Sequence, residues 1–568
     1  MRHKSNHTMS LISIRFILVV LCTIWAQLAL AQTRYNVSSQ AEFDNAHDQA
    51  NPHDTIVWVS GTYADIFMDI TVDGLTIWPS TNGSVIFNGA SKVEIHSDDI
   101  LFSGFQYVGG DIGDDHVIRI WGSNVLITQI NIQDYTSYKY LIIDEDSRRT
   151  TVSYSNFENR LNLDDQNILS ILVDDEPGYH KVQYCSFKNF EGTGNDLGIE
   201  PVRIGVSTQA HLNSRSTVEY CYFTNCDGDG EMISNKAAQN VIRYNTFVDN
   251  SKAELVLRHG DDAIVYGNFF INNMGGVRVR EGSGHYIYNN YFEGLDRRAI
   301  YLQNDPSDPL SDIHIYHNTI INSQEFILGG DGSNPPLNVT IANNIFSDPQ
   351  DDLFEDATGN ETWISNMYFG SLGISQTEGL VNADPLLAVN DMGYYQLDTE
   401  SPATNAAEGG YPDIPLFEGM DYDSELALDL MKQMRPTVIT SRTIGASEPS
   451  AIRVHPHATE ENTGPDYFRE SEVITSVSDV VRASVIYPNP GNDRLKIELP
   501  GSNVDRIKCR VVGLDGSILL EKDSIHTNEF ELDISRLSSG NYILELTNYN
   551  SAGNVLYQEH HSFIKSNR

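Results

Sequence analysis

Basic side chains recur at a fixed spacing in the middle of the chain. Lys236 is followed after 22 residues by Arg258, and Arg258 is followed after another 22 residues by Arg280. Arg258 and Arg280 each begin an Arg-x-Gly triplet, and an earlier triplet of this kind begins at Arg203. If the spacing is the repeat length of the fold, these four side chains stack at one corner on successive rungs. Neighbouring positive charges lower the pKa of a lysine, so this basic ladder would suit a groove for a polyanion with Lys236 as a base.

Two carboxylates come just before this lysine, in the segment GDGEMISNK. On a strand, Asp229 and Glu231 project to the same face, so they would border the same groove. Two acids would repel an anionic substrate unless a cation sat between them, and hard oxygen ligands suit Ca²⁺. Two alternatives remain: the segment is a solvated turn of an acidic protein, or the basic side chains point apart and pair with local carboxylates.

A sequence repeat predicts the elements that hold these groups. A small or polar residue, any residue, and then Phe or Ile recur as SNF, CSF, CYF, NTF, NFF, NYF, NTI and NIF, at spacings of 22 to 36 residues. Short alternating strands precede these triplets, and repeats of this length indicate a solenoid. The varying period favours a right-handed parallel β-helix, where insertions enter at turns, over propeller blades. We expect this all-β fold over residues 32–449, with an inner stack of aromatic rings from Phe187, Phe223, Phe247, Phe270 and Phe292.

Other segments are assigned around this repeat. The asparagines of the triplets should form a hydrogen-bonded ladder, and Ser39–Ala50 reads as an amphipathic helix that covers the N-terminal end of the solenoid. The coils are expected to continue through GYYQL, Gly393–Leu397, and SPATNAA, Ser401–Ala407. The segment Asp423–Met434 is expected to be a helical insertion, and the solenoid should close near residue 449.

Charge and composition narrow the location and the partners. The formal net charge of −41 argues against a general polyanion-binding surface and against a nucleic-acid partner. Residues 1–31 read as a signal peptide, with basic residues, an apolar run and the cleavage site Ala29-Leu30-Ala31. No other segment is long enough to span a bilayer, so no stable membrane insertion is expected.

Four cysteines remain after the signal peptide: Cys185, Cys221, Cys226 and Cys509. They lack metal-ligand spacing and are interpreted mainly as small core residues, with one disulfide as the alternative.

The composition changes again after a polar linker, residues 450–481. Residues 482–568 alternate like the strands of a small β-sandwich. The blocks YPNP, GLDG and LSSGNYIL and the basic end closely resemble the C-terminal sorting domain of type IX secretion substrates. This resemblance implies the type IX secretion machinery as a partner, export across the outer membrane, and a secreted or cell-surface location. An Ig-like binding module is the alternative.

The central block resembles polysaccharide lyase family six, which contains alginate lyases and chondroitin B (dermatan) lyases. The resemblance covers most of residues 33–449, and its most specific elements are the E-x-I-S-x-K segment that ends at Lys236 and the R-H-G-D motif that begins at Arg258. It implies Lys236 as the base and Arg258 as the acid. It also implies a Ca²⁺ ion that neutralises the uronate carboxylate, with Glu231 as one ligand.

The sequence departs from the family pattern at the expected metal site. Asp229 stands where the family usually has a glutamate, although an aspartate can still coordinate. The family's asparagine ligand comes from the preceding coil, which here offers Asn195, with Asp196 as a neighbour that spacing does not exclude. His259 is expected to contact substrate, with a structural histidine of the turn as the alternative. The remaining rungs of the ladder, Arg203 and Arg280, are expected to bind substrate.

These residues together predict a β-elimination on a uronate polysaccharide. Alginate is the expected substrate, and dermatan sulfate is the alternative within the family. A β-helix glycoside hydrolase would use clustered aspartates and a water, and we see no acid cluster that repeats at the coil period. A non-catalytic glycan-binding adhesin would use the ladder only as a binding strip. Elimination creates a conjugated double bond that absorbs light, which separates the three classes.

Overall fold

A computed structural model of the chain describes residues 32–162, 166–192, 198–304, 309–390, 393–449 and 457–469, and stretches of the C-terminal region between residues 485 and 565. The chain divides into two compact units, one of which comprises Gln32–Ser471. The expected signal peptide, residues 1–31, lies outside the described residues.

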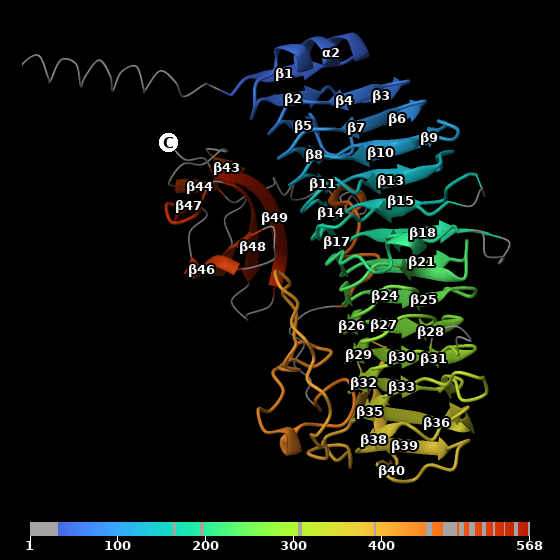
Figure 1. The fold of residues 1–568 in the computed structure, drawn as a ribbon. Coiled ribbons are helices and arrows are strands. Elements are labelled where there is room, and N and C mark those ends of the chain that lie inside the picture. The colour runs from blue at the N-terminus through green and yellow to red at the C-terminus, as the bar shows by residue number, and fades with distance from the viewer. Residues whose placement is uncertain are drawn as a thin grey trace, which may run out of the picture. The chain divides into compact units, whose positions relative to one another are not determined.

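Three parallel sheets run along the first unit, and successive coils add strands to each sheet (Figure 1). Sheet 1 contains β1 (Arg34–Val37), β2 (Thr55–Trp58), β5 (Thr76–Pro79), β8 (Leu101–Ser103), β11 (Leu126–Thr128), β14 (Thr151–Ser153), β17 (Lys181–Gln183), β20 (Thr217–Glu219), β23 (Val241–Arg243), β26 (Ile264–Tyr266), β29 (Tyr286–Tyr288), β32 (His314–Tyr316), β35 (Thr340–Ala342) and β38 (Thr362–Ile364). Sheet 2 contains β4 (Phe67–Ile70), β7 (Lys92–Ile95), β10 (His116–Ile120), β13 (Lys139–Ile143), β16 (Leu169–Ile171), β19 (Val202–Ile204), β22 (Glu231–Asn235), β25 (Glu254–Leu257), β28 (Gly275–Val279), β31 (Arg298–Leu302), β34 (Phe326–Ile327) and β37 (Phe354–Glu355). Sheet 3 contains β3 (Gly61–Ala64), β6 (Val85–Gly89), β9 (Gln106–Gly110), β12 (Asn131–Gln133), β15 (Asn156–Glu158), β18 (Ser186–Phe190), β21 (Tyr222–Cys226), β24 (Thr246–Val248), β27 (Phe269–Ile271), β30 (Tyr291–Glu293), β33 (Thr319–Ile321), β36 (Ile345–Asp352), β39 (Asn366–Ser371) and β40 (Leu380–Asn382). The parallel β-solenoid predicted from the repeats is therefore confirmed.

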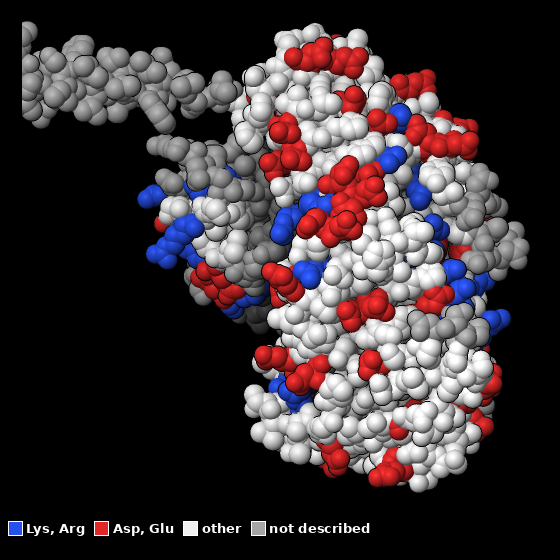
Figure 2. Space-filling view, in the orientation of Figure 1, with Lys and Arg blue, Asp and Glu red and all other residues white. Residues whose placement is uncertain are grey.

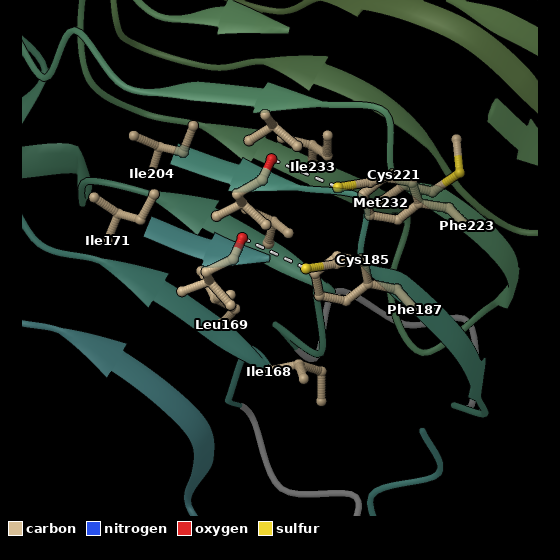
Figure 3. Packing of buried hydrophobic residues seen from close by; sticks show 14 of the residues in the cluster. Ile168, Leu169, Ile171, Cys185, Phe187, Ile204, Cys221, Phe223, Met232 and Ile233 are labelled. Carbon is tan, nitrogen blue, oxygen red and sulfur yellow. Dashed lines mark hydrogen bonds between the residues drawn. The ribbon is translucent and has the colours of Figure 1, made fainter. Parts of the chain in front are cut away.

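The inside of the solenoid is filled by rows of identical side chains. The expected phenylalanines stack from coil to coil with ring centroids 4.7–5.1 Å apart, in a row that begins at Phe157 and ends at Phe292. Cys185 and Cys221 lie one above the other beside this row, and each thiol contacts a backbone carbonyl oxygen (Figure 3). The four described cysteines are free and buried, so the interpretation as core residues is confirmed.

The asparagine ladder is also confirmed. The side-chain amide of each member donates to the amide oxygen of the next at 3.0 Å, along Asn245, Asn268, Asn290, Asn318, Asn344 and Asn366. The same amides also donate to backbone carbonyls of the preceding coil, as Asn268 does to Ile242 at 2.9 Å. The ladder thus satisfies buried backbone groups where the chain turns from sheet 1 to sheet 3.

A helix covers the N-terminal end of the solenoid, as expected. Helix α2 (Gln40–Gln49) begins after Ser39, whose hydroxyl accepts a hydrogen bond from the Glu42 amide at 3.3 Å. Its buried face carries Phe43, which stacks on Trp58 at 6.0 Å. The helix therefore shields the apolar end of the bore from water.

The prediction that coils continue to Ala407 is wrong. The sheets end with β40 at Asn382, and β41 (Leu387–Val389) and β42 (Tyr395–Leu397) form a separate antiparallel pair. The following residues run back along the outside of sheet 1, where Tyr286 donates to the Asp413 carbonyl at 3.0 Å and Tyr288 to the Asp423 carbonyl at 2.8 Å. This return segment covers tyrosines that the coils leave on their outer surface.

The helix predicted for Asp423–Met434 is absent from the structure, which places turns there. The Asp423 carboxylate accepts hydrogen bonds from the amides of Ala427 and Leu428, both at 2.9 Å. Asp429 accepts from two further amides in the same way. These aspartates compete with the helical carbonyls for the backbone donors, and the apolar residues pack on the solenoid instead of on one face of a helix.

Part of the expected linker packs against the solenoid. Within residues 457–469, the Gly464 amide donates to the Tyr184 carbonyl at 2.9 Å, and the Asp466 amide donates to Gln129 at 2.7 Å. The Tyr467 hydroxyl reaches the Phe105 carbonyl at 3.5 Å. This segment therefore belongs to the same compact unit as the coils.

The C-terminal region forms two small antiparallel sheets. One contains β43 (Val485–Tyr487), β44 (Arg494–Glu498) and β47 (Glu529–Asp533), and the other contains β46 (Ile518–Ile525), β45 (Arg506–Gly513), β48 (Gly540–Tyr549) and β49 (Val555–Lys565). Apolar side chains of both sheets share one buried cluster, which includes Leu495, Leu532, Val511 and Leu544. This arrangement agrees with the expected β-sandwich. Among the described residues, none of the helices has the length and apolar character needed to cross a membrane.

Interrupting the asparagine ladder should lower the stability of the fold substantially. Asn268→Ala would remove the acceptor of the Asn245 backbone amide and the side-chain donor to the Ile242 carbonyl, both of which are buried. We expect the free energy of unfolding to fall by about 2–5 kcal/mol, because each unmet buried group costs about 1–3 kcal/mol. Urea unfolding followed by fluorescence measures this difference.

The matched control is Asn272→Gly, at an exposed position with a φ of 53° that glycine adopts readily. A loss of similar size in both variants would contradict a special role for the buried ladder.

Candidate active site

Three of the four predicted rungs share one column at the end of sheet 2. In the strand register Asn235 pairs with Leu257 and Leu257 with Val279, so the next residues, Lys236, Arg258 and Arg280, follow one another on successive coils. Lys and Arg side chains gather along one edge of the solenoid at the height of its middle coils (Figure 2).

The predicted place of Arg203 in this column is wrong. Ile204 pairs with Asn235, so Gly205, not Arg203, shares the column of Lys236. Arg203 pairs with Ser234 and lies two positions earlier on the outward face of sheet 2. The prediction aligned the Arg-x-Gly triplets by their arginines, and this alignment gives the wrong register for the coil that contains Arg203.

A buried glutamate still joins Arg203 to the site. The Glu200 carboxylate accepts from Arg203 Nη2 at 2.5 Å, and its other oxygen lies 3.8 Å from Lys236 Nζ. Burial raises the pKa of Glu200, and the two cations oppose that rise. Burial also lowers the pKa of Lys236, as do the positive charges of Arg203 and Arg258, against the opposing effect of Glu200. The lysine is therefore biased toward its neutral form.

The two predicted carboxylate ligands are both buried. Glu231 accepts from Arg258 Nη1 at 2.9 Å through one oxygen, while its other oxygen is buried without a hydrogen-bond partner. Asp229 accepts from the Gly198 amide at 2.5 Å. A buried carboxylate oxygen without a partner, such as that of Glu231, has the chemistry of a ligand for a hard cation such as Ca²⁺.

The rest of the predicted metal site is incomplete in the part of the chain that the structure covers. Asn195 and Asp196 lie outside the described residues. Within the described ranges, no three His, Cys, Asp or Glu side chains group together as a metal site. A cation on Asp229 and Glu231 would therefore need other ligands as well.

His259 and Arg280, the other predicted substrate contacts, both lie close to Glu281, an acid that the sequence interpretation missed. His259 Nδ1 contacts the carboxylate of Glu281, and the second oxygen of that group lies 3.5 Å from Arg280 Nε. Burial lowers the pKa of His259, and Arg258, Lys236 and Arg280 lower it further. His259 thus lies within the electrostatic field of the column.

A second column of charge, made of glutamates, was also missed. Glu231 pairs with Glu254 in the register, and counting back from the pair of Val202 with Ile233 places Glu200 beside Glu231. All three residues are at most 3% exposed. The expectation that no acids repeat at the coil period is therefore wrong. The signal was present, because the segments EPVRIG, EMISNK and ELVLRH each begin with glutamate.

A buried lysine lies two coils before this group on the same sheet. Lys139 Nζ donates to Asn167 Oδ1 and to Ser170 Oγ, both at 2.8 Å, and neither partner is charged. Burial lowers the pKa of Lys139 to about 8, with a further contribution from Arg203. Its isolated position in the sequence gave no indication of this environment.

The comparison with protein families decides the relationship. The family model described as Chondroitinase B matches residues 37–360, which is more than half of the chain. The chain belongs to the chondroitinase B family. A second model, described as a secretion system C-terminal sorting domain, matches residues 485–555. No curated protein matches the sequence.

Solved structures share the fold of this chondroitinase B family member. The PL6 family alginate lyase AlyGC has a TM-score of 0.59 at 23% identity, over 65% of this chain and 56% of that one. A mannuronic acid specific family 6 lyase from human gut microbiota has a TM-score of 0.55 at 21% identity, over 62% and 92% of the two chains. The family 6 lyase Pedsa3628 from Pseudopedobacter saltans has a TM-score of 0.51 at 20% identity, over 66% and 98%. The chain thus spans little more than half the length of AlyGC.

The buried environment of Lys139 predicts that its amine loses its proton at a lower pH than an ordinary lysine. We expect its amine to titrate near pH 8, because burial disfavours the charged form. Reductive methylation with ¹³C-formaldehyde followed by NMR reports each lysine, and Lys139→Arg assigns the signal.

Lys92 of the same sheet is the matched control. It has ion pairs with Glu94 at 2.9 Å and Asp115 at 2.7 Å, and these partners raise its pKa against the effect of burial. If the Lys139 signal titrates together with that of Lys92, Lys139 does not occupy a buried environment with neutral partners.

Proposed function

We propose that this family member is a polysaccharide lyase that cleaves a uronate-containing polyanion, most specifically alginate, by β-elimination. The observation that carries the proposal is the adjacency of Lys236 and Arg258 on successive coils, beside a buried carboxylate with one unmet oxygen. This arrangement provides a base, a cation and a place for a metal ion at one point of an outward face.

The reaction follows from the state of these side chains. Lys236 in its neutral form would take the C5 proton of the uronate, and its lowered pKa increases the population of that form. As the proton leaves, a double bond forms between C4 and C5 and the C4–oxygen bond breaks. Arg258 would stabilise the developing negative charge and supply the proton for the leaving oxygen. No water is consumed.

We further propose that Asp229 and Glu231 hold Ca²⁺ with additional ligands, for which Asn195 is the candidate. When bound, the ion would neutralise the uronate carboxylate and so make the C5 proton more acidic. Glu231 is paired with Arg258 at 2.9 Å. A cation would compete for that carboxylate and leave the guanidinium freer to face substrate.

The names of the structural neighbours support alginate as the substrate. AlyGC and the gut lyase are an alginate lyase and a mannuronic acid specific lyase. The family model carries the name of chondroitinase B, so dermatan sulfate is the second candidate, and both polymers should be tested in the first assay.

Each glutamate of the column contacts at least one arginine or lysine. These ion pairs disfavour the free acid and free base that a glycoside hydrolase requires.

The C-terminal sorting domain supports export. Its match over residues 485–555 implies recognition by a secretion system and a secreted or cell-surface location. We propose that the type IX machinery is the partner and that residues 1–31 direct the first step of export. A lyase outside the cell would meet its polymer before any uptake.

Replacing the proposed base tests the function. Lys236→Arg should lower turnover about 10²–10⁴-fold, the usual value of a general base, because a guanidinium stays protonated at working pH. The increase in absorbance of the unsaturated product measures turnover on alginate and on dermatan sulfate. Lys92→Arg is the control on the same sheet and should keep wild-type turnover. If Lys236→Arg keeps more than about a tenth of the activity, another group, first His259, must be the base.

The proposed metal site predicts a stability change as well as an activity change. A chelator should abolish most activity, and Ca²⁺ should restore it. Ca²⁺ should also raise the thermal midpoint, because a ligand that binds only the folded state at 100 times its Kd stabilises that state by about 2.7 kcal/mol.

Glu231→Gln should lose this thermal shift, whereas the exposed Glu145→Gln should keep it. Full activity in excess chelator, with no thermal shift on adding Ca²⁺, would refute the metal site.

A further inference from the structure

A second basic cluster lies on sheet 2 beyond the Lys236 column. We call it the distal cluster, and it consists of Arg278, Arg298, Tyr301, Gln303 and Glu254. Arg298 donates to both oxygens of Glu254, at 2.7 and 3.1 Å, and Arg278 Nη1 lies 3.7 Å from the same carboxylate. Arg278 Nε donates to Gln303 Oε1 at 2.7 Å, and Nη2 of the same guanidinium contacts that oxygen.

The distal cluster carries a net positive charge. Two guanidinium groups share one carboxylate, and the other partner, Gln303, is neutral. Burial lowers the pKa of Arg278, and the positive charges of Arg298 and Arg280 lower it further against the opposing effect of Glu254 and Glu231. Its side chain keeps 23% of its surface exposed, whereas Glu254 keeps 1%. An anion from solution can therefore reach Arg278 but could not displace the buried glutamate.

An aromatic ring lies among these charges. The Arg298 guanidinium lies 4.3 Å from the centroid of the Tyr301 ring and that of Arg278 lies 5.9 Å from it. Arg278 and Tyr301 are partners in the register of neighbouring strands. A partly exposed ring beside guanidinium groups offers an apolar face for a sugar ring and charged donors for its carboxylate.

The register fixes where this cluster lies relative to Lys236. Ser234 pairs with Val256, and Val256 with Arg278, so Arg278 is two coils beyond the strand that precedes Lys236. Tyr301 is one coil further. With about 4.8 Å between rungs, the cluster begins roughly 10 Å along the solenoid from the proposed base, which is about the length of two pyranose units.

We propose that the distal cluster binds a carboxylate-bearing sugar of the same polymer chain, two to three units from the bond that is cleaved. The proposal rests on the function proposed above and adds the direction of the substrate. The polymer would lie along the solenoid axis and extend from Lys236 toward the C-terminal coils. Arg278 would bind the carboxylate, and Tyr301 would contact the sugar ring.

The proposal predicts a dependence on chain length that a structural role would not produce. A trimer centred on the Lys236 rung ends before the Arg278 rung, whereas a hexamer extends past it. Arg278→Ala should therefore lower the ratio of kcat/KM on the hexamer to kcat/KM on the trimer about tenfold, as expected for one charge-assisted hydrogen bond. Arg278→Lys should recover part of the ratio, because it keeps the charge but loses the planar donor pair.

Arg148→Ala is the matched control, because Arg148 is also partly exposed and paired with a carboxylate, that of Asp174 at 2.7 Å, but lies outside sheet 2. It should leave the ratio unchanged. An equal loss on trimer and hexamer, or no loss on either, would overturn the distal site.

A binding measurement separates this proposal from the proposed function. In the Lys236→Ala background, calorimetry with alginate hexamer should show about tenfold weaker binding when Arg278→Ala is added. If wild-type protein produces no unsaturated product but this difference in affinity persists, the lyase proposal fails and the distal site stands. If product forms and the affinity is unaffected by Arg278→Ala, the distal site fails alone.

Discussion

The candidate site depends on the pairing of a column of buried glutamates with cations of the same sheet. Parallel pairing places equivalent residues of successive coils about 4.8 Å apart, so a basic residue at one position meets basic neighbours on the adjacent coils. Buried like charges are unfavourable unless acids compensate them. Glu200, Glu231 and Glu254 supply that compensation through contacts with Arg203, Arg258 and Arg298. Any change in register would separate these partners.

The charges of this column are only partly paired, and the groups left without a full partner account for the proposed chemistry of the surface. The lysine at 3.8 Å from Glu200 shares that carboxylate with an arginine at 2.5 Å, so its positive charge is only weakly stabilised. One oxygen of Glu231 is left without a partner. A lysine with a lowered pKa, a nearby guanidinium and a carboxylate oxygen without a partner are features that suit an elimination on an anionic sugar. The solenoid thus combines strong structural pairing with a few groups left available for substrate.

The sequence predicted those features that repeat with the coil and failed where they do not. The triplets identified the inner phenylalanines and the asparagine ladder, because each coil repeats the same contact. The column of Lys236, Arg258 and Arg280 followed from an equal spacing of 22 residues. Arg203 was misplaced because its coil is longer and Gly205, not Arg203, occupies the position of the column. The return segment was missed because its aspartates capture backbone amides locally, which a helical pattern of apolar residues does not reveal. The glutamate column was visible in the sequence, but its meaning depends on register.

The masses of the products test most directly whether this surface carries out an elimination. A defined alginate hexamer would be incubated with the wild-type protein and the products weighed by mass spectrometry. The account predicts that the masses of each pair of products add up to the mass of the hexamer, with one member of the pair carrying the C4–C5 double bond. Product pairs whose masses exceed that of the hexamer by one water would show hydrolysis and contradict the account.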